Sequence, residues 1–251
     1  MNMFDIEKKR FLHSLVFPFF FLAVIWGVKL TEYFLDANFS HFGVYPQQLK
    51  GLPGIFLSPL IHGDFNHLIS NSIPWLTLGI GVFYFYNKIA YKIFFLIYFI
   101  TGFWVWIGAR EAYHIGASGI IYGFAAFLFT SGIIRNDIRM LAIALIVVFL
   151  YGSMVWGIFP IDMKISWESH LMGSIAGVIL AVIYKNEGPQ KIKYSWEEDD
   201  EDEDEYNGNN LPEDNEDLEI PTEQQSNTNK KNNYINYIYI EKNTNSNKQN
   251  D

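Results

Sequence analysis

The sequence predicts an all-α membrane protein: a six-transmembrane-helix bundle with a long, partly inserted first outer loop and a disordered acidic C-terminal tail. Two observations carry this prediction. Six stretches approach the roughly 20 apolar residues that a helix needs to cross a bilayer, and almost all apolar residues of the chain precede Lys185. A soluble helical protein of 251 residues would have to bury six helices that are apolar on nearly every side, which is unfavourable at this size.

The six predicted spans differ in how apolar they are. The third, which contains FFLIYFITGFWVWIG, is almost free of polar atoms, whereas the second and the sixth each open with polar residues. The basic residues predict the orientation, since 10 of them lie on one side of the bundle and 4 on the other, and the side richer in Lys and Arg faces the cytoplasm. We therefore expect both termini in the cytoplasm. In chain order the spans are residues 11–28, 68–86, 89–108, 117–134, 140–158 and 168–184.

The charge of the chain divides near position 185. Residues 1–185 carry a net charge of +3 and form the predicted membrane domain. Residues 186–251 carry −12, are too polar to bury a core, and are predicted to form an Asn-rich cytoplasmic extension. The connection between the first two spans, residues 30–66, is too apolar for disorder and is expected to fold on the outer side. The absence of cysteine excludes disulfides, thiol nucleophiles and cysteine-based metal sites.

Unusual polar residues gather at one depth of the predicted bundle. The second, fourth and sixth spans run in the same direction, so their first turns lie near the outer face. The second span carries His67 and Asn71 there, the fourth carries Ser118, and the sixth carries His170. A histidine inside a membrane helix is costly, so a functional role is the default hypothesis. Four such groups at one depth predict a functional site.

Glycines indicate how the fourth and sixth spans meet. Gly119 and Gly123 are four residues apart on the fourth span, and Gly173 and Gly177 have the same spacing on the sixth. This small-xxx-small pattern lets two helix backbones approach closely. We expect the approach to bring Ser118 within hydrogen-bond reach of the histidine on the sixth span.

A serine and a histidine in contact can act as a nucleophile and its base. The hydroxyl of Ser118 is a weak nucleophile until a neighbouring base takes its proton, and the imidazole of His170 is mostly neutral at pH 7. Asn71 and His67 are placed to donate hydrogen bonds to an oxyanion. No carboxylate is in evidence to orient His170, so we expect a Ser–His dyad in which a packed aromatic, Tyr122, takes the place of a third member.

Three motifs resemble those of the rhomboid family of intramembrane serine proteases, in its bacterial six-helix form. Residues 116–119, GASG, are similar to the nucleophile motif GxSG of that family. Residues 170–177, HLMGSIAG, resemble the base motif of its sixth helix, and residues 62–71 resemble its second-helix pattern of two histidines and an asparagine. The Trp-Arg pair common in the first outer loop of the family is absent from residues 30–66.

The resemblance implies a role for each matched residue. Ser118 is implied as the nucleophile and His170 as the general base, with His67 and Asn71 in the oxyanion site. Tyr122 is implied to stack against the base. The implied supporting residues are Gly116, Gly119, Tyr122, Gly173, Gly177 and His62.

The resemblance also implies a location and a set of partners. We expect an integral protein of the bacterial cytoplasmic membrane whose active site opens to the outer side. The implied substrates are transmembrane proteins with helix-destabilising residues near the cut. We expect no metal, no cofactor and no nucleic-acid partner, and the oligomeric state stays open.

Two other classes of function compete with a protease. A transporter would spread its polar residues along the bilayer depth and show an inverted repeat, whereas here they cluster near one face. A catalytically inactive relative that binds membrane clients would keep the same fold, and only activity distinguishes it. Among the remaining polar residues, Arg110 and Glu111 suggest an exposed loop pair, and His114 an interface residue.

Overall fold

A computed structural model describes residues 3–150, 156–161 and 165–189 of the chain. Helices make up most of this part, and no β-strand occurs among these residues. Only residues 186–189 of the predicted tail are included, so the prediction for residues 190–251 falls outside the described part of the chain.

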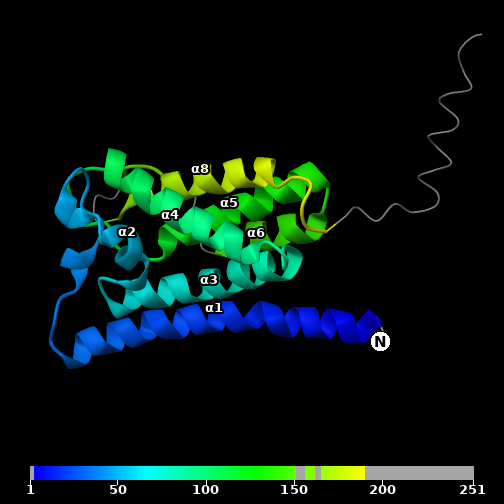
Figure 1. The fold of residues 1–251 in the computed structure, drawn as a ribbon, viewed down its shortest axis with the longest axis horizontal. Helices are drawn as coiled ribbons and strands as arrows, with labels where there is room; N and C mark the ends of the chain where they lie inside the picture. Colours follow the sequence, from blue (N-terminus) through cyan, green and yellow to red (C-terminus); the bar gives the residue numbers. More distant parts are fainter. Residues whose placement is uncertain (1–2, 151–155, 162–164, 190–251) are drawn as a thin grey trace, which may run out of the picture. The chain divides into compact units, whose positions relative to one another are not determined.

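Six long apolar helices run side by side in the described part (Figure 1). Four are long and apolar enough to cross a membrane, and the other two, α6 and α8, are shorter apolar helices. The expected count of six spans therefore stays a prediction. The helices are α1 (Met3–Phe34), α3 (Phe65–Phe85), α4 (Ala90–Gly108), α5 (Ser118–Arg135), α6 (Ile138–Leu150) and α8 (Trp167–Ile183).

Two predicted boundaries were wrong. The first span continues to Phe34, well beyond residue 28, because Lys29 and Glu32, a buried ion pair within the last turns of α1, hydrogen-bond to the following loop. The fifth predicted span, residues 140–158, does not stay helical to its end, since residues 157 and 158 lie in a turn. That turn directs a backbone carbonyl of Gly157 towards α8.

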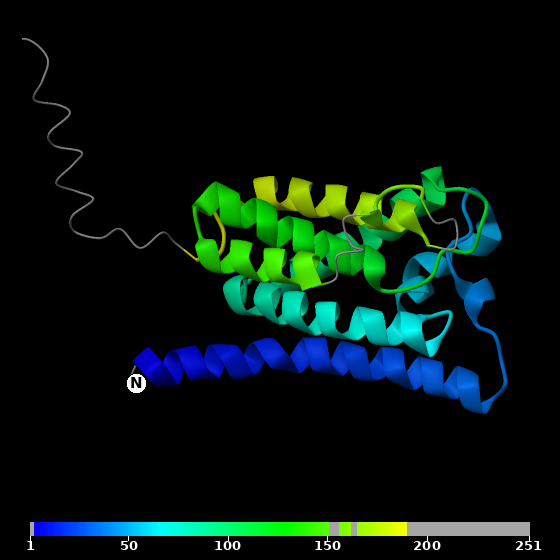
Figure 2. The ribbon, with the colours of Figure 1, turned by 180° about the vertical axis from the view of Figure 1, so that it is seen from behind.

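Helix α5 lies at the centre of the bundle and packs against α3, α4, α6 and α8 (Figures 1 and 2). Its closest neighbour is α8, because glycines remove side chains from the contact. A Cβ atom on Gly173 would overlap the carbonyl oxygen of Gly119, and one on Gly177 would overlap that of Gly123. The small-xxx-small pattern thus allows direct contact between the two backbones.

Aromatic side chains fill the space between α1, α3, α4 and α5. Trp75 stacks on Phe124 at 5.7 Å between ring centroids and lies 4.7 Å from Phe21. The indole N–H of Trp75 donates a hydrogen bond to the carbonyl of Pro18, 2.9 Å away, so this buried polar group is satisfied. Large apolar side chains, Phe20, Phe95 and Val182 among them, are exposed on the outer faces, as expected for helices in contact with lipid.

The loop between α1 and α3 is folded, as the sequence predicts, and contains short helical turns. These are η1 (Ser40–Phe42), η2 (Leu49–Gly51), α2 (Gly54–Leu57) and η3 (Ser58–Leu60).

A buried ion pair of α1, Lys29 with Glu32, fastens both ends of this loop to the helix. The ammonium of Lys29 donates to Glu32 at 2.7 Å and to the carbonyls of His62 and Gly63 at 3.0 and 2.9 Å. The second carboxylate oxygen of Glu32 accepts the backbone N–H of Phe39 at 2.7 Å. The ion pair and these hydrogen bonds compensate for the free energy of hydration that both charges lose on burial.

Further contacts hold the loop against α4 and the α4–α5 connection. The backbone N–H of Gln47 donates to the carbonyl of Trp106 at 2.8 Å, and Tyr98 donates its hydroxyl proton to the carbonyl of Phe56. Val44 forms an isolated antiparallel bridge with His114. The loop is therefore anchored without the Trp-Arg pair that the sequence lacks.

The α5–α8 contact predicts a strong effect of a very small substitution. Gly173→Ala should destabilise the protein by about 1–3 kcal/mol, because the added methyl group pushes the two backbones apart. Gly27→Ala is a matched control, since a Cβ atom there meets nothing within 4 Å. Thermal unfolding of the purified protein in detergent, followed by circular dichroism, measures both. Equal melting temperatures for the two variants would contradict the packing argument.

Candidate active site

A cavity of about 510 Å³ opens at the end of the bundle where α3, α5 and α8 begin. It brings together residues from three helices and from the turn after α6. The lining includes His67, Asn71, Ser118, Tyr122, Gly157 and His170. The polar residues that the sequence places at one depth therefore share one cavity.

The backbone just before α5 is shaped to present Ser118 as the first residue of that helix. Gly116 has a φ of +106°, a conformation that side chains disfavour, and its N–H donates to the carbonyl of Ser58 at 2.8 Å. A Cβ atom on Gly116 would lie 2.8 Å from Cε1 of His67. Only glycine therefore fits between the α1–α3 loop and α3 at this position.

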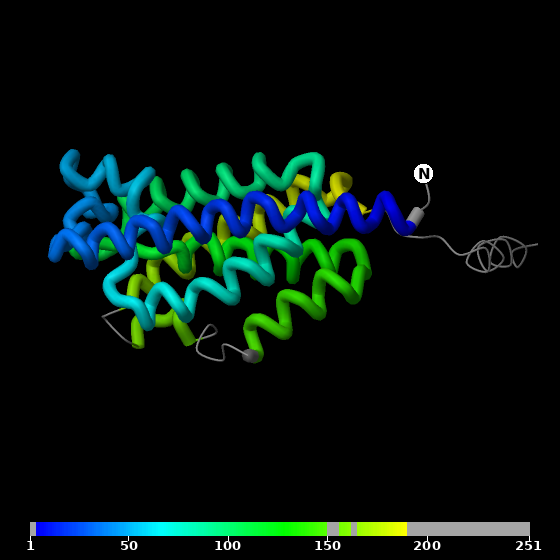
Figure 3. Tube along the Cα trace, turned by 90° about the horizontal axis from the view of Figure 1, so that it is seen from below, coloured from blue at the N-terminus to red at the C-terminus, as the bar shows by residue number. Residues whose placement is uncertain are grey.

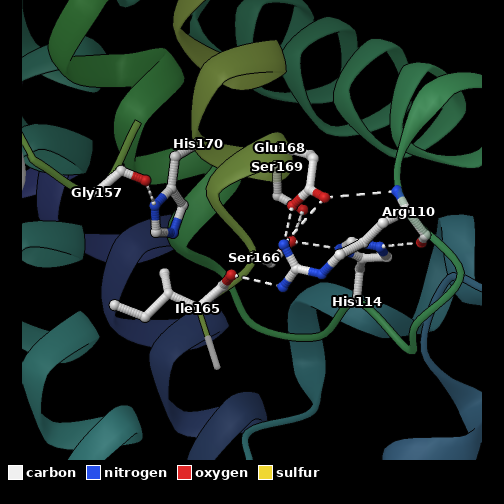
Figure 4. Close-up of polar contacts among 8 residues, drawn as sticks. All are labelled: Arg110, His114, Gly157, Ile165, Ser166, Glu168, Ser169 and His170. Atoms are coloured by element: carbon white, nitrogen blue, oxygen red, sulfur yellow. Dashed lines mark hydrogen bonds and ion pairs between the residues drawn. The ribbon is translucent and has the colours of Figure 1, made fainter. Parts of the chain in front are cut away.

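Ser118 and His170 are in direct contact. The serine Oγ lies 2.8 Å from Nε2 of His170, and both residues are buried. The other ring nitrogen, Nδ1, lies 2.9 Å from the carbonyl oxygen of Gly157 (Figure 4). Because a carbonyl only accepts, Nδ1 carries the proton, and Nε2 is the acceptor for the serine hydroxyl.

Gly157 is a site residue that sequence reasoning missed. Its contribution is a backbone carbonyl, which every residue has, so no side-chain pattern points to it. Its lack of a side chain also matters, because a Cβ atom at Gly157 would overlap the hydroxyl of Tyr122. The Tyr122 ring itself stacks on His170, with centroids 4.1 Å apart and planes 5° from parallel.

Two polar side chains of α3 line the same cavity as Ser118. His67 and Asn71 both line it, and the amide nitrogen of Asn71 is buried without a hydrogen-bond partner in the described part of the chain. An unpaired buried donor costs free energy, which a ligand with an acceptor atom would recover.

His62 holds the residue just before α5 in place and takes no direct part in the contact between Ser118 and His170. Its Nε2 accepts the backbone N–H of Ala117, 3.4 Å away, and its ring lies 4.9 Å from that of His67. Burial, helped by the nearby His67, lowers the pKa of His62 to about 3. The ring is therefore neutral and able to accept that hydrogen bond.

An ion pair between the partly exposed Arg110 and the buried Glu168 holds the start of α8 beside the cavity. The guanidinium of Arg110 lies 3.0 Å from each carboxylate oxygen of Glu168 and donates to the carbonyl of Ile165 at 2.8 Å (Figure 4). The pairing of Arg110 with Glu111 suggested by the sequence was therefore wrong. Glu168, two residues before His170, is only 4% exposed. A carboxylate buried to this extent needs a cationic partner, and Arg110 pairs with it and not with its neighbour in the loop, Glu111.

A second set of hydrogen bonds strengthens the same junction. Burial lowers the pKa of His114, which is therefore neutral. Its Nε2 lies 3.0 Å from the carbonyl of Arg110 and donates to it, so Nδ1 accepts the hydroxyl proton of Ser166 at 2.6 Å (Figure 4). The Ser166 oxygen lies 2.6 Å from that of Ser169. His114 is therefore a buried residue that joins two segments of the fold, whereas the sequence suggested an interface residue.

Comparison with known proteins identifies the family. Residues 50–187 match the family model described as "Rhomboid domain", which covers more than half of the chain. The chain therefore belongs to the rhomboid family, and it is an integral membrane protein. The resemblance seen in the three motifs is confirmed.

The chain is also similar to mycobacterial proteins. "Uncharacterized protein Rv1337" of Mycobacterium tuberculosis and "Uncharacterized protein Mb1372" of Mycobacterium bovis are each 31% identical over 177 residues, covering 65% of this chain and 72% of theirs. "Uncharacterized protein ML1171" of Mycobacterium leprae is 28% identical over 175 residues, 65% of this chain and 68% of that protein. These likenesses assign no activity.

The ion pair beside the cavity predicts that two arginine substitutions lower the free energy of unfolding by different amounts. Arg110→Ala should lower the free energy of unfolding by about 3 kcal/mol, because it leaves the buried carboxylate of Glu168 without its partner. Arg139→Ala is the control, since its pair with Asp137 is on the surface and is worth about 0–1 kcal/mol.

Unfolding in mixed micelles of increasing SDS content measures both variants. Arg110→Met combined with Glu168→Met should recover much of the loss, since neither charge is then buried alone. Similar losses for the two single arginine variants would contradict the assignment.

Proposed function

We propose that the chain is an intramembrane serine endopeptidase, which cleaves transmembrane segments of membrane proteins near the outer face of the bilayer by a Ser–His dyad. The observation that carries the proposal is the 2.8 Å contact between Ser118 Oγ and His170 Nε2. This contact lies in a cavity that also holds the amide nitrogen of Asn71, a buried donor without a hydrogen-bond partner among the described residues. Membership of the rhomboid family supports the same reaction class.

The first half of the proposed reaction is acylation. A substrate helix unwinds beside the cavity, and Ser118 Oγ attacks the carbonyl carbon of the scissile peptide bond. Nε2 of His170 takes the hydroxyl proton, which requires the neutral ring that the Gly157 contact orients. The oxyanion accepts hydrogen bonds from Asn71, from His67 and from the Ser118 backbone N–H, which has no helical partner at the start of α5.

The second half releases both products. His170 passes its proton to the leaving amine as the C–N bond breaks, and an acyl ester remains on Ser118. Water then enters the cavity, gives a proton to His170 and attacks the ester carbonyl, and the serine hydroxyl is restored. Hydrolysis in a membrane needs access to water, so the proposed site opens to the outer side, with both termini in the cytoplasm.

The alternative is a catalytically inactive relative that binds membrane clients. It keeps the same helices but has no need for a serine within hydrogen-bond distance of a neutral histidine. The hydrogen bond therefore favours the protease, and measured activity separates the two.

Ser118→Ala is predicted to abolish labelling of the purified protein by a fluorophosphonate probe, because the nucleophilic oxygen displaces fluoride from the probe and becomes phosphonylated. His170→Ala should slow labelling by about 10²–10⁴-fold, since the base is lost. Ser131→Ala is the matched control, a buried serine on the same helix, and should label like the wild type.

A single-pass transmembrane substrate reconstituted with the protein in liposomes gives the second readout. The wild type should cleave it and Ser118→Ala should not. A wild type that neither labels nor cleaves, while still binding the substrate, would establish the client-binding alternative.

Asn71→Ala is expected to reduce kcat by about 10²–10³-fold with little change in KM, because the oxyanion forms only along the reaction. Ser70→Ala, which alters the adjacent cavity residue, is the control. Cleavage kinetics in liposomes provide both constants. A rise in KM at unchanged kcat would instead place Asn71 in substrate binding.

A further inference from the structure

The end of the bundle opposite the candidate active site contains a basic cavity of about 410 Å³. It lies among the start of α1, the α3–α4 connection, the start of α6 and the residues after α8, which Figure 3 shows at one end of the molecule. The basic residues of its lining are Arg10, Lys88 and Arg139, and the acidic one is Glu187. The proposed reaction uses none of these groups.

Two of the three cations have donors to spare. Nε of Arg10 is buried without a hydrogen-bond partner in the described part of the chain, and its guanidinium is 3.8 Å from Glu7. Within the same described residues Lys88 has no ion-pair partner, whereas Arg139 is held by Asp137 at 2.7 Å. Unpaired donors around a cavity favour a ligand with several anionic oxygens, of which phosphate is the best match.

An apolar groove of about 720 Å³ adjoins this basic cavity. It runs between α1, α3 and α6, where Phe11, Thr77, Ile80 and Ile143 line it, and it shares Phe85 with the basic cavity. Phe11 is half exposed, so the groove faces the lipid phase of a membrane.

We propose that the basic cavity and the groove form one binding site for an anionic phospholipid. The phosphate accepts hydrogen bonds from Arg10 and Lys88, and an acyl chain lies in the groove. A free phosphate would leave the groove unused, and a lipid without net charge would not balance the cations. The positive-inside rule places this end of the bundle in the cytoplasmic leaflet, where anionic lipids attract basic residues.

Native mass spectrometry of the full-length protein tests the site. Dioleoylphosphatidylglycerol and dioleoylphosphatidylcholine are titrated separately into the detergent-solubilised protein, and the Kd of the first bound lipid is measured. The variant Arg10→Gln/Lys88→Gln should weaken binding of the anionic lipid by about tenfold or more, because it removes two charged donors. Binding of the phosphatidylcholine should stay weak in all variants.

The matched control removes two charges at the same end of the bundle, outside the cavity. Lys92→Gln/Lys185→Gln should change the Kd by no more than about twofold, since distant surface charges are screened. Equal weakening by the two double variants would reduce the effect to overall surface charge and overturn the proposal.

Two further measurements separate the lipid from other anions. Thr77→Trp fills the groove and should weaken lipid binding, while sn-glycerol 1-phosphate should compete only at far higher concentration. An unchanged Kd in Thr77→Trp, or a soluble headgroup that binds as tightly as the lipid, would show that the cavity binds phosphate alone and would overturn the proposal of a lipid site. Displacement of the lipid by a synthetic peptide of residues 197–205, EEDDEDEDE, would overturn it in favour of the acidic tail.

Discussion

The contact between the backbones of α5 and α8 is the constraint on which the candidate site depends. Gly173 lies so close to the carbonyl of Gly119 that a single methyl group does not fit between them. Since Ser118 precedes Gly119 by one residue and His170 precedes Gly173 by three, this contact sets the distance between hydroxyl and imidazole. Apolar helices in lipid gain little from burial against one another, so close packing has to supply the attraction.

Polar contacts then restrict the relative movements of α5 and α8 that close packing alone still allows. A glycine-lined contact allows two helices to slide or rotate, and such movement would separate Ser118 from His170. The ion pair between Arg110 and Glu168 prevents it at the first turn of α8, where unsatisfied charges in a poorly hydrated region would be costly. The bridge between Val44 and the α4–α5 connection carries the same restraint into the loop between α1 and α3. The loop therefore belongs to the support of the site.

The helices and the shared depth of the polar residues could be predicted because they depend on composition and on spacing along the chain. The contact of Ser118 with His170 could be predicted because the glycine spacing on both helices indicates where the two backbones meet. The stacking of Tyr122 follows from its position one turn after Ser118. The partners of Arg110 and His114 could not be predicted, since no spacing pattern in the sequence indicates that these loop residues meet Glu168 and Ser166. The same holds for Gly157, whose contribution is a main-chain carbonyl without any sequence signature.

The carbonyl of Gly157 also indicates why the proposed Ser–His dyad needs no carboxylate at this position. A carboxylate at Nδ1 would orient His170 and stabilise its protonated form, but an additional negative charge at this depth would need its own partner. A carbonyl accepts the same hydrogen bond from Nδ1 and orients the ring without adding a negative charge. The nearest carboxylate on α8, Glu168, is already paired with Arg110 and faces away from the imidazole (Figure 4). Orientation of His170 therefore comes from the carbonyl and from the parallel ring of Tyr122, two neutral groups that a membrane interior tolerates.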